Sequence, residues 1–321
     1  MASQWAANGG NNKKCSDEEF IQLFTQQGAT ETARILKTSE RGVYARRKSL
    51  ERFVPINAPT KAGTASNNPA RIELSVPDGV VLVAGDGHYW PGKASTAHRA
   101  FVKFAKEMKP KAVVYNGDAF DGSTVSRFPD IGWENNPTVA EELEAVQERL
   151  GEIEQAAPKN CVLTWNLGNH DLRYEMRLAS VAPQFRNIKG FHLKDHFPVW
   201  KPAWATWING DVVTKHRFKG GTHATHNNVI GAGLSIVTNH LHSLKVTPWS
   251  DYRDRPRWGV DCGCLANPSG PQFVNYSEDN PHNHRSGFGL LTFYKGKLLW
   301  PELVHVFDDS HVEFRGDIIK V

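Results

Sequence analysis

Residues 80–88 read Val-Val-Leu-Val-Ala-Gly-Asp-Gly-His, an apolar run that ends on an aspartate and a histidine. The run from Val80 to Ala84 is short and rich in valine, which predicts a strand covered on both faces. Asp86 and His88 stand where such a strand ends. Open α/β sheets build their sites at the carboxyl ends of strands. This stretch therefore predicts both the type of sheet and the position of a site.

The same arrangement of an apolar run followed by polar residues recurs along the chain. The run 112–115 precedes Asp118 and Asp121, the run 162–165 precedes Asn169, His170 and Asp171, and the run 236–238 precedes His240 and His242. His216 stands alone in Lys-His-Arg. Carboxylates, imidazoles and one amide oxygen form a ligand set that suits divalent Mn, Fe or Zn. We therefore expect a metal site at the strand ends.

In this order the segments resemble the calcineurin-like metallophosphoesterases, whose pattern is D-x-H, G-D-x-x-D, G-N-H-D, H and G-H-x-H. The match spans about Val80 to His242. Asn239 stands where the family usually has glycine, and asparagine tolerates a positive φ better than most residues. The resemblance implies an α/β (α+β) fold in which two mixed β-sheets form a sandwich flanked by helices.

The resemblance also implies two divalent metal ions, Mn foremost, with Fe, Zn or Mg as alternatives. It assigns Asp86, His88, Asp118 and His242 to one ion, and Asp118, Asn169, His216 and His240 to the other. His170 would contact the phosphoryl group and protonate the leaving oxygen, Asp171 would orient His170, and Asp121 would support the site. Paired divalent ions polarise a phosphoryl group and generate hydroxide near neutral pH.

The fold does not determine the substrate, because it serves protein phosphatases, nucleotide phosphodiesterases and nucleases alike. The Gly-Asp-Ala-Phe-Asp segment resembles the SbcD-type DNA-repair nucleases. The serine/threonine phosphatase branch carries an arginine directly after the second aspartate, where this chain has Gly122. We therefore expect a DNA nuclease that cleaves phosphodiester bonds. Two alternatives remain: a phosphomonoesterase or phosphatase acting on proteins or small nucleotides, and a DNA-binding regulator. His223 and His226, in a glycine-rich loop, are expected to touch a substrate phosphate.

The N-terminal region is predicted to form three helices, residues 17–27, 30–36 and 40–52, with Ser39 as the N-cap of the third. This order resembles a helix-turn-helix DNA-binding module. Residues 34–52 carry seven basic and two acidic side chains, a net charge of +5 that exceeds the +4 of the whole chain. Basic residues on a recognition helix suit phosphate and guanine contacts, so we expect Arg41, Arg46, Arg47 and Lys48 to contact DNA. The alternative is a helical cap or an oligomerisation element.

Composition sets the remaining expectations. We expect a disordered tail (1–15), the helix-turn-helix-like module (16–53), a linker rich in Pro, Ala, Thr, Gly, Ser and Asn (54–70) and the catalytic domain (71–321). The N-terminus has no apolar signal-peptide stretch, no run is long enough to span a membrane, and four cysteines make no disulfide framework. These features predict a cytoplasmic protein. A compact nuclease joined to a DNA-binding module, with nucleic acid as its partner, would suit a bacterial cell or a phage-infected host, and self-association is left open.

Overall fold

The computed structural model describes residues 14–54, 56, 68–128, 135–252, 255–277, 280 and 282–321. The chain divides into two compact units, residues 1–67 and 68–321. The predicted tail and linker lie largely outside the described residues. Among the helices of the described residues, none has the length and apolar character that a membrane span requires. The four cysteines are free thiols.

The first unit contains the three predicted helices. Helix α1 (Asp17–Ile35) is broken into two helical segments at Gly28, where φ is 79°, and helix α2 (Glu40–Leu50) follows. Ser39 caps α2 as expected, because its hydroxyl accepts a hydrogen bond from the backbone N–H of Gly42. The hydrophobic core of this unit consists of Phe20, Phe24, Ala33, Leu36, Val43 and Ile56, and α1 also buries the polar Thr32.

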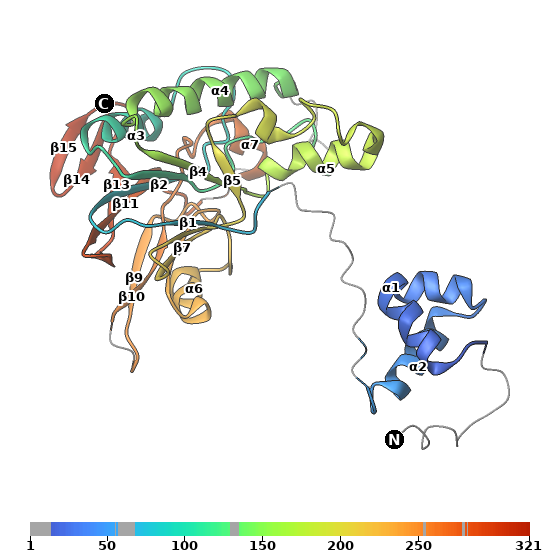
Figure 1. The fold of residues 1–321 in the computed structure, drawn as a ribbon. Coiled ribbons are helices and arrows are strands. Elements are labelled where there is room, and N and C mark those ends of the chain that lie inside the picture. The colour runs from blue at the N-terminus through green and yellow to red at the C-terminus, as the bar shows by residue number, and fades with distance from the viewer. Residues whose placement is uncertain are drawn as a thin grey trace. The chain divides into compact units, whose positions relative to one another are not determined.

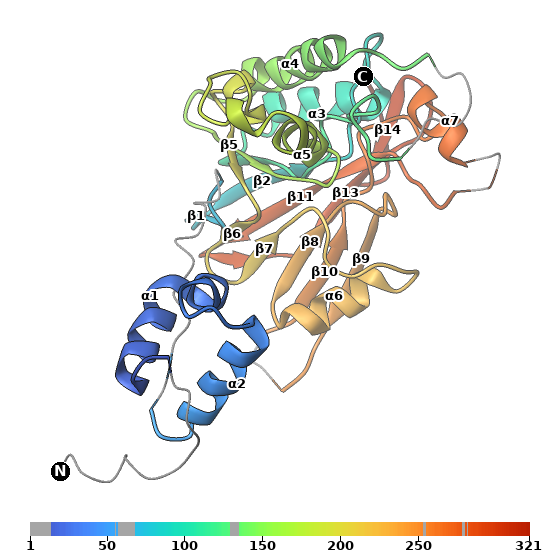
Figure 2. The same ribbon diagram turned by 90° about the vertical axis from the view of Figure 1, so that its right-hand side faces the viewer.

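The second unit is built on two mixed β-sheets (Figures 1 and 2). The smaller sheet has, in spatial order, β1 (Ile72–Leu74), β6 (Thr206–Ile208), β7 (Val212–Thr214), β8 (Ser235–Thr238), β10 (Arg257–Asp261) and β9 (Lys245–Trp249). The larger sheet has β15 (Asp317–Lys320), β14 (His311–Phe314), β13 (Glu302–Val306), β11 (Gly287–Tyr294), β2 (Gly79–Ala84), β3 (Ala112–Tyr115), β4 (Val162–Asn166) and β5 (Lys201–Ala203), with β12 (Lys297–Leu298) paired to β11. The two mixed sheets confirm the predicted fold class.

Helices cover the outer faces of both sheets. On the larger sheet lie α3 (Thr96–Glu107), α4 (Val139–Ala156) and α5 (Asp171–Val181), and on the smaller sheet lies α6 (Ala224–Ala232) (Figure 2). The remaining helical segments are short: α7 (Pro271–Ser277) and two 3₁₀ turns, Pro183–Phe185 and Leu193–His196. The fold thus has four layers, with the sheets in the middle.

Strand β2 shows why the sequence folds in this way. Val81 and Val83 are buried in the core between the two sheets, together with Ile208 and Val237 of the smaller sheet. Leu82 and Ala84 alternate with them and are buried on the opposite face, in the core that includes residues of α3 and α4. A strand covered on both faces needs apolar residues at every position, which accounts for the unbroken run that opens the motif. The parallel strands β2, β3 and β4 end at one edge of the sheet.

Candidate metal centre and active site

The residues expected to bind metal come together from both sheets. Asp86 and His88 follow β2, Asp118 follows β3 and Asn169 follows β4, all in the larger sheet, whereas His216 follows β7 and His240 and His242 follow β8 in the smaller one. The backbone N–H of His240 donates to Oδ2 of Asp86 at 2.8 Å. This bond joins the end of a strand in one sheet to the end of a strand in the other.

Three groups of side chains are placed so that each could hold a metal ion. Two consist of expected ligands: Asp86, His88 and His242 in one, and Asp118, His216 and His240 in the other. The third, His88, Asp121 and His170, shares His88 with the first. Within each group the potential ligand atoms all lie within 4.8 Å of one another. Asn169 joins the second group, since its Oδ1 lies 3.2 Å from Nε2 of His216. The structure therefore brings the seven expected side chains close together, with Asp118 grouped only with His216 and His240, whereas the resemblance assigned it to both ions.

Unpaired buried atoms indicate that a cation fits this site. Oδ1 of Asp86 and Nε2 of His88 are buried, and neither makes a hydrogen bond within the described part of the chain. Oδ1 of Asp86 lies 3.2 Å from Nε2 of His242, but the two are not aligned for a hydrogen bond. Buried polar atoms are nearly always paired. A divalent cation between these groups would satisfy both.

The electrostatics of the site also suit a cation. Burial alone would raise the pKa of Asp86, but the imidazoles of His242 and His216 outweigh it and hold that pKa below its usual value. Burial would lower the pKa of His216, but Asp118 and Asp86 outweigh it and raise that pKa well above its usual value. Without a cation, the two carboxylates thus hold a proton on His216.

The backbone at these positions is strained. Asp86, His88, Asp118, His240 and His242 all have φ between 40° and 71°. Non-glycine residues rarely adopt this left-handed conformation, because it costs about 1–3 kcal/mol at each residue and persists only where the surrounding structure imposes it. Strain of this kind concentrates at functional sites, so the backbone supports the assignment independently of the side chains.

One glycine permits the close approach of two strand ends. A Cβ atom at Gly168 would lie 2.0 Å from Oδ1 of Asp118. That same oxygen accepts a hydrogen bond of 2.8 Å from the backbone N–H of His170. The loop after β4 can therefore pass over Asp118 only because residue 168 has no side chain.

Asp121 holds two histidines of the centre. Its Oδ1 lies 2.9 Å from Nδ1 of His88 and 2.9 Å from Nδ1 of His170. The two imidazole rings lie edge to face, with 4.6 Å between their centroids. Burial would raise the pKa of Asp121, but its bonds to His170 and His88 hold it far below its usual range. The expected supporting role of Asp121 corresponds to this position.

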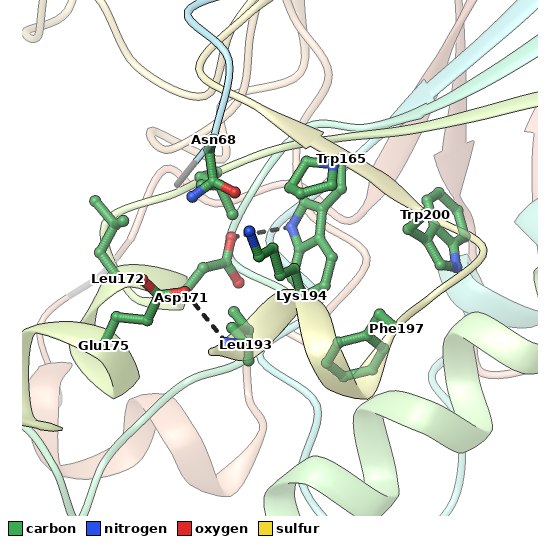
Figure 3. Close-up of a pocket in the computed structure, with 11 residues that line it drawn as sticks. Asn68, Trp165, Asp171, Leu172, Glu175, Leu193, Lys194, Phe197 and Trp200 are labelled. Atoms are coloured by element: carbon green, nitrogen blue, oxygen red, sulfur yellow. Dashed lines mark hydrogen bonds between the residues drawn. The ribbon is translucent and has the colours of Figure 1, made fainter. Parts of the chain in front are cut away.

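The expectation that Asp171 orients His170 was wrong. The carboxylate of Asp171 accepts hydrogen bonds from the backbone N–H groups of Asp118, Ala119, Phe120 and Gly168. It also accepts one from the indole N–H of Trp165, at 3.1 Å, and Figure 3 shows the two side chains facing one another. Since Asp121 takes the imidazole of His170, Asp171 instead fixes the loop that carries Asp118.

Asn239 also differs from the expectation. It does not adopt a positive φ; the next residue, His240, does so instead, with φ 71°. The buried side chain of Asn239 donates to the carbonyl of Gly263 at 2.8 Å and accepts from Asn116 at 2.9 Å. Asn116 in turn accepts from Asn166 at 2.7 Å. This chain of amides connects the ends of β3 and β4 to the end of β8, and thus one sheet to the other.

His223 and His226 do not lie in a simple loop. His223 is the N-cap residue of α6, and His226 lies within that helix. The ring of His226 packs edge to face against Trp249 of β9, with 5.3 Å between centroids. Neither histidine belongs to the two ligand groups within the described residues. The glycines of the segment suggested a loop, but its second half forms a helix on the outer face of the smaller sheet.

Several residues near the centre had no recognisable sequence signal. The ring of His284 lies 4.5 Å from that of His242, and the ring of His282 stacks on that of His284. Asp261 is buried at the end of β10, and burial raises its pKa to about 7. Glu142 of α4 is fully buried and accepts from the backbone N–H of Gly122, next to Asp121. A lone histidine or glutamate carries no local pattern, so only the tertiary structure reveals these neighbours.

The basic residues of the first unit fall into two classes. Arg46 donates to the carbonyl groups of Cys15 and Ser16 and pairs with Asp17 at 2.7 Å. Arg47 pairs with Glu51 at 2.6 Å. Arg41 and Lys48 are exposed. Of the four residues expected to contact DNA, two are thus engaged in contacts within the unit and two are exposed.

A mixed α/β sandwich that gathers carboxylates and imidazoles at its strand ends is the architecture of a metal-dependent hydrolase. The sequence model of the family described as calcineurin-like phosphoesterase matches residues 79–274, more than half of the chain. The chain therefore belongs to the calcineurin-like phosphoesterase family.

The solved structures that are similar to this chain include two of known origin. One is a single mutant of Vps29 from Entamoeba histolytica, with 13% identity, a TM-score of 0.37 and coverage of 75% of this chain and 99% of the other. The other is a protein serine/threonine phosphatase from Saccharomyces cerevisiae with similarity to human phosphatase PP5, with 14% identity, a TM-score of 0.36 and coverage of 75% and 85%. A comparison with functionally curated proteins finds no match.

Proposed function

We propose that the protein is a two-metal phosphodiesterase that acts on nucleic acid, and specifically a DNA nuclease. The observation that carries the hydrolytic part is the pairing of the Asp86 group and the Asp118 group at the junction of the two sheets. Two divalent ions held there, with Mn²⁺ foremost, would polarise the phosphoryl group and supply a hydroxide nucleophile near neutral pH.

The protein's own residues have distinct roles in this proposal. Asp118 belongs to the second group: one carboxylate oxygen lies 3.0 Å from Nε2 of His216, and the other accepts from the backbone N–H of His170. His170 is held through Nδ1 by Asp121, which leaves Nε2 as the atom that can reach the leaving oxygen. The carboxylates of Asp118 and Asp121 outweigh burial and raise the pKa of His170, which suits a proton donor.

The choice of a phosphodiester in DNA rests on two further features. The residue after Asp121 is a glycine rather than the arginine of the serine/threonine phosphatase branch. The first unit also has two exposed basic residues, Arg41 and Lys48, on its second helix. We propose that this unit anchors the enzyme on duplex DNA, where neutralised phosphates would make binding strongly salt-dependent.

A substrate panel in Mn²⁺ tests the proposal. The purified full chain is given linear duplex DNA, single-stranded DNA, a cyclic nucleotide, a phosphopeptide and an aryl phosphodiester. We expect hydrolysis of DNA and of the aryl phosphodiester, with loss of both activities in Asp118→Asn. Turnover of the phosphopeptide alone would contradict the nuclease assignment. DNA binding without hydrolysis of any substrate would indicate a regulator.

A second variant tests the role of His170. His170→Gln should retain both metals and slow hydrolysis by about 10²–10⁴-fold, the usual contribution of a general acid. Loss of the metals in this variant, measured by elemental analysis, would contradict that role.

A further inference from the structure

Arg173, in the first turn of α5, places its guanidinium against the centre. One terminal nitrogen, Nη2, lies 3.1 Å from Nε2 of His170. The other, Nη1, donates to the backbone carbonyl of Asp121 at 3.0 Å. The side chain is half-buried. Arg173 therefore occupies the face of His170 on which the proposed function places the leaving oxygen.

The charge of Arg173 has no carboxylate partner in the part of the chain that the structure describes. Three other half-buried or buried arginines pair with carboxylates: Arg46 with Asp17, Arg149 with Glu152 and Arg257 with Asp251. The half-buried Arg99, remote from His170, instead donates to carbonyl and hydroxyl oxygens. The contacts of Arg173 are instead a carbonyl oxygen and an imidazole nitrogen, both formally neutral acceptors. A half-buried guanidinium in this situation is suited to an anion supplied from outside.

The side chain of Arg173 reaches this position because residue 122 is a glycine. A Cβ atom at Gly122 would lie 3.1 Å from Cβ and 3.3 Å from Cδ of Arg173, and 2.8 Å from the ring of Phe120. Gly122 also has φ 65°, in the left-handed region. Because Gly122 has no side chain, the aliphatic part of the Arg173 side chain can lie directly beside it.

We propose that Arg173 binds a non-bridging oxygen of the substrate's phosphoryl group and, in doing so, releases Nε2 of His170. Before substrate binds, a guanidinium N–H donates to Nε2, so the proton of the neutral ring lies on Nδ1 and faces Asp121. A phosphoryl oxygen is a far better acceptor for a guanidinium than an imidazole nitrogen, because the bond is charge-assisted on both sides. The incoming phosphoryl group would therefore draw Arg173 away and free Nε2, which takes up a proton from solvent before the ring passes one to the leaving oxygen.

This proposal rests on the proposed phosphoester hydrolysis, and binding of a product anion tests it separately. Inorganic phosphate is titrated into the Mn²⁺-loaded full chain by calorimetry, and metal content is measured for every variant. Hydrogen bonds to charged groups contribute about 1.5–3 kcal/mol, so Arg173→Gln should weaken phosphate binding about 10- to 100-fold. Arg173→Lys keeps the charge but loses the planar fork, and it should weaken binding less.

The matched control is Arg177→Gln, which removes the same charge from an exposed position one turn further along α5. It should leave both phosphate affinity and turnover unchanged.

Kinetics on an aryl phosphodiester supply the second readout: loss of an anchoring arginine raises KM as well as lowering kcat. Unchanged phosphate affinity with a lower kcat would show that Arg173 only positions His170, and would overturn the proposal. If Arg173→Gln does not fold, the Lys variant decides, because unchanged phosphate affinity there overturns the proposal as well. Weakened phosphate binding in a protein that hydrolyses no substrate of the panel would instead overturn the proposed function.

Discussion

Nε2 of His216 lies 3.0 Å from Oδ2 of Asp118, so the end of β7 in one sheet meets the end of β3 in the other. At this contact a proton and a metal ion compete for Nε2 of His216. In the metal-free protein Asp118 and Asp86, against the effect of burial, raise the pKa of His216 to about 10. A histidine can ligate a metal only when it is neutral, so metal binding must expel this proton.

The first prediction concerns the pH dependence of metal binding. Because His216 stays protonated up to about pH 10 in the metal-free protein, Mn²⁺ affinity should rise with pH between 6 and 9. The rise should be roughly tenfold per pH unit for each proton released. Calorimetry in two buffers of different ionisation enthalpy counts the protons. An affinity independent of pH, with no proton release, would contradict the competition.

The second prediction concerns Asp171, whose two carboxylate oxygens accept from four backbone N–H groups and one indole. In Asp171→Asn one oxygen becomes an NH₂ group, so at least two buried donors lose their acceptor, at about 1–3 kcal/mol each. We expect a clear drop in melting temperature and weaker Mn²⁺ binding, because the loop of Asp118 loosens. Trp165→Phe removes only the indole donor from this set and should have a smaller effect. Full stability and metal content with a lower kcat would instead restore the role of orienting His170.

The third prediction concerns the buried carboxyl of Glu142. Burial, reinforced by the charge of Asp121, raises its pKa from 4.5 to about 7. When the pKa of an acid is higher in the folded protein than in the unfolded chain, the protein loses stability as the pH rises from the lower value to the higher one. In that range the acid is ionised in the unfolded chain but still protonated in the folded protein. Glu142→Gln cannot ionise and escapes this loss, which is on the order of 3 kcal/mol.

The measurement for Glu142 is thermal unfolding of the metal-free protein from pH 4.5 to 9. The stability of Glu142→Gln relative to wild type should rise from pH 4.5 to about 7 and stay level above. Glu144→Gln, an exposed position on the same helix, should show no such trend. A difference between variant and wild type that does not change with pH would refute the assignment.

The fourth prediction separates the basic residues of the first unit. Arg46→Ala removes an ion pair, two bonds to carbonyl groups and a contact over the ring of Phe20, so it should destabilise this unit. The double variant Arg41→Ala with Lys48→Ala should leave its stability unchanged. It should weaken duplex binding and reduce the log–log salt slope by about 0.9 for each phosphate that is no longer neutralised. A double variant that binds duplex DNA as wild type does would indicate a helical cap or an assembly element.

The sequence predicted most of what depends on local pattern. The strands at 80–84, 112–115 and 162–165 and the cap at Ser39 could be predicted from apolar runs and N-cap chemistry, and the structure has them. The grouping of Asp86 with His242 came from the family pattern, because nothing in the spacing of residues 86 and 242 reveals that they meet.

Side-chain contacts that depend on the tertiary structure could not be predicted from the sequence. Whether His170 meets Asp171 or Asp121 depends on how the loops after β3 and β4 cross, and the family resemblance implied the wrong one. Arg173 stands in the sequence as an ordinary helical arginine. Asn239 resembled a substitute for a flexible glycine, whereas in the fold it is one link of a buried amide chain.

That amide chain bears on how the catalytic unit comes apart. Asn166 and Asn116 belong to the ends of one sheet, Asn239 to the end of the other, and their side chains bond in series. If either sheet unfolded alone, it would leave buried amides of its neighbour without partners, at the cost that unpaired polar groups carry inside a protein. These bonds therefore couple the two sheets and favour their loss of structure together, in one cooperative step. We therefore expect no stable intermediate in which one sheet is folded and only half of the metal centre is assembled.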